Sequence, residues 1–296
     1  MSNPKRRRKR RNRPNPIGQR LLMIFIFLIM AYMMWTTRTN QPVTVPDGNI
    51  WVHFIDVGQG DSILIQSTYN AVLIDAGVPA AGPVVANYIE SLGISTIDFV
   101  VATHPHNDHI GGLPAVLDRF EVFEVWAPDR AHDTAAFERF LDAVDRNNLE
   151  ITTITAGDTL SAGIIHMTAL APVRSGYANM NDYSIVMYLQ FGHTSFMFTG
   201  DAEAVSENDM LESGRNLRAS VLQAGHHGSR TSTTEAFLTA VAPQAVVISV
   251  GAGNQFGHPH PEVLERLERH GVMILRTDEL GTIVMMTDGE YVSWDG

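Results

Sequence analysis

Short apolar runs separated by turn-forming residues recur along the chain from residue 50 onward. Runs of this kind, bounded by Gly, Pro, Asn or Asp, predict strands. The predicted strands span residues 50–57, 62–66, 71–75, 99–102, 164–170, 184–191, 194–199, 219–224, 246–250, 273–275 and 283–287. Helices are predicted over residues 83–92, 113–120, 134–147 and 261–269. Strands mixed with helices, without an internal repeat, predict an α/β fold in which helices cover two sheets.

A different pattern precedes this region. Between Arg20 and Arg38 the chain has 17 consecutive uncharged residues, most of them Leu, Ile, Phe or Met. This length is at the short end for a membrane-spanning helix, and Tyr32 and Trp35 take positions typical of an interfacial aromatic belt. We therefore expect a single N-terminal transmembrane helix.

The charges around this apolar segment predict its orientation. The first 20 residues hold nine Lys or Arg and no acid, and because positive flanks stay in the cytoplasm, the rest of the chain is expected outside it. A cleaved signal peptide has a similar pattern, but no small-x-small motif follows Trp35, which favours an uncleaved anchor. The expected organisation is a basic cytoplasmic tail (1–20), an anchor (21–37), a linker (38–48) and one folded domain (49–296).

The composition limits the chemistry of this domain. The chain contains no cysteine, so disulfides and thiolate ligands are excluded, and a metal would be bound by His, Asp, Glu or Asn. Outside the first 20 residues the chain carries 12 of its 21 basic residues and all 32 acidic ones. Such an acidic surface argues against tight non-specific binding of nucleic acid.

The densest group of polar side chains directly follows the predicted strand 99–102. The segment reads Thr-His-Pro-His-Asn-Asp-His-Ile-Gly-Gly and contains His104, His106, Asp108 and His109. A loop at a strand end can turn all four side chains toward one point, and the glycine pair lets the chain bend away. Imidazole with carboxylate suits zinc, manganese or iron, and the cluster is too dense for one tetrahedral ion. It therefore predicts two metals rather than histidines that only cap a helix.

Residues 104–109, His-x-His-x-Asp-His, resemble the signature of the metallo-β-lactamase superfamily. Three more stretches are similar to the metallo-β-lactamase domain of the ComEC family of DNA-uptake channels: Asp-Val-Gly-Gln-Gly-Asp-Ser (56–62), Gly-His-His-Gly-Ser (225–229) and Phe-Gly-His-Pro-His-Pro (256–261). The resemblance covers about residues 50–290, and the many membrane helices of those channels are not part of this sequence. It implies an αββα sandwich with a dinuclear metal centre.

Two downstream segments carry further candidate ligands. Asp201 follows a predicted strand in Gly-Asp; such an Asp often caps a helix, but after the histidine cluster it matches the superfamily's bridging aspartate. His226 and His227 also follow a strand, and because neighbouring side chains of an extended chain point in different directions, we expect only one to bind metal. His226 is the favoured ligand, with His227 as its neighbour or as proton donor to the leaving group, and the two roles can be exchanged.

One position departs from the superfamily. In much of it a histidine near residues 179–184 completes the first metal site, whereas this chain has Asn-Met-Asn-Asp-Tyr-Ser there. His166, within a predicted strand, and His193, in a hairpin turn, are expected to be structural. Asp182 is the expected replacement, and its oxygen would shift the metal preference toward manganese.

Four more residues complete the predicted site. By the resemblance, Asp75 orients the ligand loop from behind, although an Asp two residues before a glycine also forms turns. Ser229 and Arg230 adjoin the histidine pair and are expected to contact substrate oxygens or the leaving group. His258, in a proline-rich loop, is expected either to bind a substrate oxygen or to be structural.

These residues predict a hydrolase. Two divalent metal ions, zinc or manganese, would activate a water molecule, with Asp108 and His227 as catalytic residues. The resemblance implies a phosphodiester substrate, with extracellular DNA as the leading example, and thus a nuclease related to competence. The acidic surface favours a second expectation, a lactone, β-lactam or envelope phosphoester. A non-catalytic DNA-uptake module is the third. The membrane is the one macromolecular partner that the sequence itself indicates, and no protein partner can be inferred.

Overall fold

A computed structural model describes residues 48–294. The predicted basic tail and anchor, and all but the last residue of the predicted linker, lie outside the described residues. Within residues 48–294 no helix combines the length and the apolar character needed to span a membrane.

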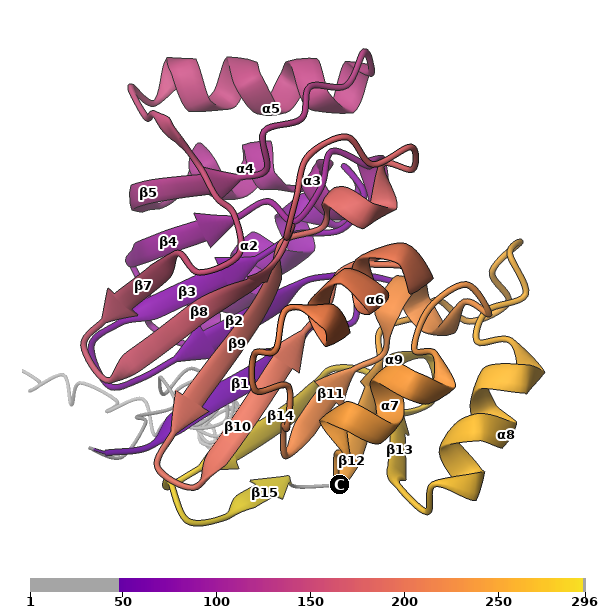
Figure 1. Cartoon of the computed structure of the whole chain (residues 1–296). Helices are drawn as coiled ribbons and strands as arrows, with labels where there is room; N and C mark the ends of the chain where they lie inside the picture. The colour runs from indigo at the N-terminus through magenta and orange to yellow at the C-terminus, as the bar shows by residue number, and fades with distance from the viewer. Residues whose placement is uncertain (1–47, 295–296) are drawn as a thin grey trace, which may run out of the picture. The chain divides into compact units, whose positions relative to one another are not determined.

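The first sheet contains eight strands in the order β15-β14-β1-β2-β3-β4-β5-β6 (Figure 1). Their bounds are β1 Ile50–Phe54, β2 Ile63–Gln66, β3 Ala71–Ile74, β4 Thr96–Val101, β5 Glu121–Ala127, β6 Ile151–Thr153, β14 Ile283–Thr287 and β15 Val292–Trp294. Strands β3 to β6 are parallel, so their carboxyl ends share one edge of the sheet. The loop with the histidine cluster leaves this edge after β4.

The second sheet contains seven strands in the order β13-β12-β11-β10-β9-β8-β7. Their bounds are β7 Thr159–Ala162, β8 Ile165–Ala171, β9 Val186–Phe191, β10 Thr194–Phe198, β11 Val221–Gln223, β12 Ala245–Ile248 and β13 Met273–Arg276. Strands β10 to β13 are parallel. Asp201 and the histidine pair follow the carboxyl ends of β10 and β11.

Helices cover the outer face of each sheet, which gives four layers (Figure 1). Helices α2 Gly82–Ser91, α4 Leu113–Leu117 and α5 Ala135–Arg146 pack on the first sheet, and α6 Ala204–Glu212, α7 Glu235–Val241 and α8 Pro261–Arg269 pack on the second. Apolar side chains of both sheets, among them Phe54 and Phe198, form the core between them. Short helices are α3 Asn107–Ile110 and α9 Thr277–Leu280, with 3-10 turns η1 Asn181–Tyr183 and η2 Gly225–Gly228. The αββα sandwich predicted from the sequence is confirmed.

The sequence pattern does not predict several of the observed elements. Strand β5 and helix α7 were not predicted, and neither were the short strands β6, β7 and β15. In β5, Glu124 interrupts the apolar run and Phe123 is exposed, and β5 lies next to the edge strand β6. A strand near a sheet edge needs little continuous apolar surface, so its sequence gives a weak signal.

Candidate metal centre

Side chains from both sheets converge at the carboxyl ends of their parallel strands. The loop after β4 carries His104 and His106, and α3 carries Asp108 and His109. Among the described residues, four triplets have potential ligand atoms that all lie within 4.8 Å of one another, and two of them include Asp61. We call the other two the first group (His104, His106, Asp201) and the second group (Asp108, His109, His227).

Asp201 lies between the two groups. Its Oδ1 is 3.2 Å from Nε2 of His109 and 3.5 Å from Nε2 of His227. Its Oδ2 is 3.6 Å from Nε2 of His104. One carboxylate therefore faces both groups with different oxygens, which is the arrangement of a bridging ligand.

The buried atoms at the centre test whether these residues fit metal ions. Nδ1 of His109 lies 2.8 Å from a carboxylate oxygen of Asp75, and Nδ1 of His227 lies 3.0 Å from the carbonyl oxygen of Ser249. Each ring donates its Nδ1–H to these acceptors, so a neutral ring keeps the lone pair of its Nε2 for a cation. Both Nε2 atoms and Oδ1 of Asp201 are buried without a hydrogen-bond partner. Such atoms are costly to bury unpaired, and a divalent cation among them satisfies all three. The residues therefore fit a metal centre.

Electrostatics support the same conclusion. Burial opposes protonation of His109, but the carboxylates of Asp201 and Asp75 outweigh it and hold its pKa well above the usual value. The pKa of His227 is raised in the same way, with Asp201 and Asp61 outweighing its burial. Burial opposes ionisation of Asp201, yet His109 and His227 keep its pKa well below the usual range. The carboxylates thus require positive charge close by, which divalent ions provide.

Asp75 lies behind the ligand loop rather than in the cavity. It is fully buried, and its carboxylate accepts hydrogen bonds from the backbone N–H of Thr103 (2.9 Å) and from the hydroxyl of Thr103 (2.6 Å), in addition to His109. Burial raises its pKa, and His109 opposes that shift. Asp75 therefore fixes both the start of the loop and the ring orientation of His109.

The histidine pair does not have the extended backbone from which its roles were predicted. His226 and His227 have φ values of 51° and 55°, so both lie in the left-handed region. His227 is buried within the second group, whereas His226 belongs to neither triplet and its side chain is 25% exposed. Nδ1 of His226 lies 3.1 Å from Glu203, and Nε2 lies 3.6 Å from Oδ2 of Asp201. The geometry favours His227 as the ligand, the reverse of the preferred assignment from the sequence.

Asp182 is also placed differently from the prediction. Its Oδ1 accepts the backbone N–H groups of Glu203 (3.3 Å) and Ser206 (3.2 Å) at the start of α6, and it belongs to neither group. Its neighbour Asn181 lines the cavity instead. The amide nitrogen of Asn181 donates to Glu203 at 2.9 Å, and its Oδ1 is buried without a partner. The oxygen available at this position is therefore that of Asn181, because Asp182 caps a helix.

A cavity of about 220 Å³ opens onto both groups. Its lining consists of Gln59, His106, Asp108, Asn181, Asp201, His226, His227, Phe256 and His258. Gln59 accepts the backbone N–H of Gly251 at 3.2 Å through Oε1, and its Nε2 is buried without a partner. Gly60 lets this loop approach the centre, since a Cβ there would collide with the carbonyl oxygen of Asp108.

Two predicted contact residues lie away from this cavity lining. The Ser229 hydroxyl is 3.0 Å from that of Thr231, and the exposed Arg230 lies 3.6 Å from Glu262.

Sequence reasoning missed Gln59 and Asn181 because neutral amides carry no ligand signature of their own. Asp61 was noted only as part of a motif, yet it accepts Nε2 of Gln223 at 2.6 Å and so joins the loop before β2 to β11.

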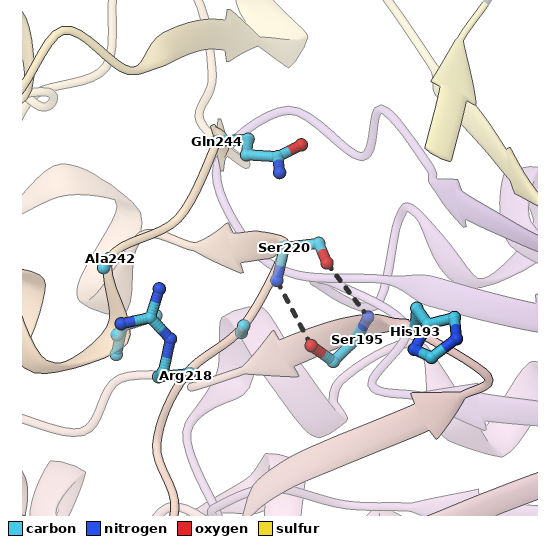
Figure 2. A pocket seen from close by; sticks show the side chains of 8 residues that line it. His193, Ser195, Arg218, Ser220, Ala242 and Gln244 are labelled. Atoms are coloured by element: carbon cyan, nitrogen blue, oxygen red, sulfur yellow. Dashed lines mark hydrogen bonds between the residues drawn. The ribbon is translucent and has the colours of Figure 1, made fainter. Parts of the chain in front are cut away.

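A second hollow of about 220 Å³ lies at the opposite ends of β10 and β11 (Figure 2). Figure 2 shows the exchanged contacts of Ser195 and Ser220, in which each backbone N–H donates to the other's hydroxyl oxygen at 3.2 and 3.3 Å. His193 and Arg218 also line it, and none of its lining residues is a carboxylate. It therefore lacks the ligand set of the metal centre. The other histidine set aside from the sequence, His166, lies on β8, exposed and 3.0 Å from the Ser161 hydroxyl.

Comparison with known proteins finds relatives that match most of this chain. ComE operon protein 3 of Bacillus subtilis (strain 168) is 32% identical over 250 residues, which cover 78% of this chain and 32% of that protein. Competence protein ComA of Neisseria gonorrhoeae is 29% identical over 250 residues, which cover 82% of this chain and 33% of that protein. The chain thus spans about a third of the length of these relatives.

Solved structures share the fold. The metallo-β-lactamase fold protein YhfI from Bacillus subtilis superposes with a TM-score of 0.54 at 12% identity, over 83% of this chain and 100% of that one. A family model described as the metallo-β-lactamase superfamily matches residues 55–252. This match includes the loop after β4, Asp201 and the histidine pair, and the chain therefore belongs to the metallo-β-lactamase superfamily.

Proposed function

We propose that the protein is a dinuclear metal-dependent hydrolase of phosphodiester bonds, held by a single membrane anchor with its catalytic domain outside the cytoplasm. The observation that carries the hydrolase is the pair of ligand groups that Asp201 connects, in which buried donor atoms lack a partner. The anchor and its orientation rest on the apolar segment 21–37 and the basic residues before it.

The proposed ligands follow from the geometry. His104, His106 and Asp201 would hold one ion, and Asp108, His109 and His227, with Asp201 beside them, would hold the other. Imidazole and carboxylate donors of this kind suit zinc or manganese. When bound, these ions supply Lewis acidity and lower the pKa of water.

Residues of the chain prepare this centre for the reaction. Asp75 and the carbonyl of Ser249 fix the rings of His109 and His227, so their Nε2 atoms keep facing Asp201. Gln59 presents an unpaired N–H donor to the cavity, and we assign it to a non-bridging oxygen of the substrate. His226, anchored on Glu203, faces the cavity with Nε2 and is suited to hold the leaving oxygen.

A phosphodiester is the preferred substrate class for two reasons. The relatives include proteins named for competence, and the anionic phosphoryl group is attracted to a dinuclear cation site. Outside its first 20 residues the chain has 12 basic against 32 acidic residues, so long nucleic acids find little attraction elsewhere on the domain. The same acidic composition favours a lactone or β-lactam as the second candidate substrate.

A double substitution tests the hydrolase. Asp108→Ala with His109→Ala removes two donors from the second group, and hydrolysis of bis(p-nitrophenyl) phosphate by the full-length protein is expected to fall to background. Asp145→Ala with His166→Ala is the matched control, because both residues are exposed and outside the groups; it should retain activity.

The assay also separates the candidate functions. Parallel assays on single-stranded DNA and on a chromogenic β-lactam distinguish the two substrate classes. Retained turnover in the double variant would refute the metal-centred mechanism. Less than about one bound metal ion per wild-type chain would instead favour a non-catalytic module.

A further inference from the structure

An exposed aromatic side chain stands at the rim of the cavity. Phe256 is 53% exposed, yet it lines the same cavity as His106, Asp201 and His227. A single exposed apolar side chain is common on a protein surface, so the significance of Phe256 lies in its place in the lining of a polar cavity and not in its exposure. None of the metal ligands needs Phe256, so its place at the rim is not explained by the metal centre.

The ring of Phe256 lies against that of His258. The two ring centroids are 5.7 Å apart, and the planes are inclined by 26°, which is a stacked arrangement. His258 in turn contacts His226 edge-on at 5.4 Å. One face of Phe256 is thus supported by a chain of rings that leads to the metal centre, while the side chain as a whole stays open to solvent.

The loop that carries Phe256 is held in place by one residue. Oδ1 of Asn254 accepts the backbone N–H groups of Phe256 (3.1 Å) and His258 (3.0 Å). Its Nδ2 donates to the carbonyl oxygens of Gly251 (2.9 Å) and His258 (2.6 Å). Phe256 is therefore presented on a fixed turn, which lowers the entropy cost of binding a flat group against it.

The size of the cavity indicates what reaches this ring. Pockets that enclose a drug-sized ligand have volumes of roughly 300–1,000 Å³, whereas this cavity has about 220 Å³. A phosphodiester placed at the metal groups fits within it, but the groups on either side of the phosphorus must extend over the rim. A flat, uncharged group is the one that gains from Phe256, and in a phosphodiester of biological origin that group is a nucleobase.

We propose that Phe256, backed by His258, is a stacking platform for the nucleobase next to the scissile phosphate, so that the substrate is a nucleic acid strand with unpaired bases. The proposal rests on the proposed phosphodiesterase function. A base within a duplex is already stacked on both sides and cannot lie on Phe256, whereas an unpaired base can. Stacking also needs no positive charge, which this acidic domain has little of.

The test compares two substrates in the full-length, metal-loaded protein. One is the dinucleotide of thymidine, and the other is the same phosphodiester with hydrogen in place of both bases. For the wild type, KM for the base-free substrate is expected to be about tenfold higher than KM for the dinucleotide. In Phe256→Ala this ratio should fall toward one, and in Phe256→Trp it should be kept or increased.

A matched control and the opposing outcomes complete the test. Phe123→Ala truncates another exposed phenylalanine, on β5, and should leave the ratio as in the wild type. A wild-type ratio near one with both substrates hydrolysed, or an unchanged ratio in Phe256→Ala, would refute the platform and leave the phosphodiesterase in place. Hydrolysis of neither substrate would remove the proposed function and the platform together.

Discussion

The two ligand groups differ in how completely the protein prepares them. In the second group, His109 and His227 are each held through Nδ1 by a buried acceptor, and both Nε2 atoms face Asp201. In the first group, Nδ1 of His104 has only hydroxyl neighbours at 3.2 and 3.3 Å, and His106 is partly exposed. A group with fixed rings loses less entropy on binding, so we expect the second group to bind its ion more tightly.

This difference follows the family signature. The signature His-x-His-x-Asp-His supplies residues to both groups, but the first group lacks the histidine that much of the superfamily has before β9. There the chain offers Asn181 and, with its Nδ1 3.4 Å from the amide nitrogen of Asn181, His226, and neither belongs to the triplet. A ligand group that lacks one donor, next to a more complete group, leaves a position that a substrate oxygen can approach. The difference between the groups is thus a candidate division of labour, and two measurements test it, while a third concerns the segment that carries His226 and His227.

The largest effect is expected on metal affinity when the alanine variants of the two neighbouring histidines are compared. His227→Ala removes a direct donor of the second group and should weaken its ion by about 100-fold or more. His226→Ala should leave that ion bound and lower turnover instead, because His226 faces the cavity from outside both groups. Metal titration in buffered metal solutions, with elemental analysis, measures both. A larger metal loss in His226→Ala than in His227→Ala would reverse the assignment.

A smaller effect is expected from the residue behind the loop. Asp75→Asn keeps the size of the side chain but weakens the hydrogen bond that fixes the ring of His109. Changes of this kind typically cost 10- to 100-fold in metal affinity, and we expect about tenfold at the second group. The first group should lose less affinity than the second, since Asp75 reaches it only through Thr103, whose hydroxyl lies 3.2 Å from Nδ1 of His104. Equal losses at both groups would show that Asp75 acts on the whole loop rather than on His109.

The smallest expected effect is a change in the free energy of unfolding, and it concerns Glu207, which contacts the segment after His226 and His227. Glu207 of α6 is buried, and its carboxylate accepts the backbone N–H groups of Thr233 and Thr234, while the Thr233 hydroxyl accepts the N–H of Gly225. Burial raises the pKa of Glu207 to about 7. The folded protein therefore holds this proton more tightly than the unfolded chain does, so stability contributed by the group is present at low pH and is lost as the pH rises through 7.

Denaturant unfolding of metal-free protein between pH 5 and pH 8 measures this effect. In the wild type the free energy of unfolding should fall by about 2 kcal/mol from this group over that range. Glu207→Gln cannot lose a proton, so its curve should be flatter by that amount. Asp145→Gln, at an exposed position, is the control and should keep the wild-type slope. Equal slopes in wild type and Glu207→Gln would show that Glu207 does not titrate in this range.

The sequence predicts the fold and the first half of the site because the evidence there is local. His104 to His109 are contiguous and follow a strong apolar strand, so their convergence can be read from spacing alone. Asp201 follows from its place after a strand. The roles of His226 and His227 cannot be read in this way, because they depend on two consecutive left-handed residues, a conformation that the residue types do not signal.

Contacts between distant segments explain the remaining differences. Asn181 and Gln59 reach the cavity only when both sheets have folded together. Because neutral amides occur throughout any sequence, their residue type does not indicate this position. Asp182 has the residue type of a ligand, but the neighbouring start of α6 supplies N–H groups that it caps. Local patterns therefore locate charged ligands well, and neutral contacts appear only with the three-dimensional arrangement. The predicted anchor stays a prediction, since it lies outside residues 48–294.

Because Asp201 and His227 come from one sheet and His104 to His109 from the other, bound cations also crosslink the two halves of the sandwich. Ligands that bind only the native state raise its stability by mass action. The metal concentration in the surroundings would then govern the lifetime of the protein as well as its catalytic turnover. Metal-free protein would open more often at the end of the sandwich that carries the metal centre, and would there become accessible to proteases.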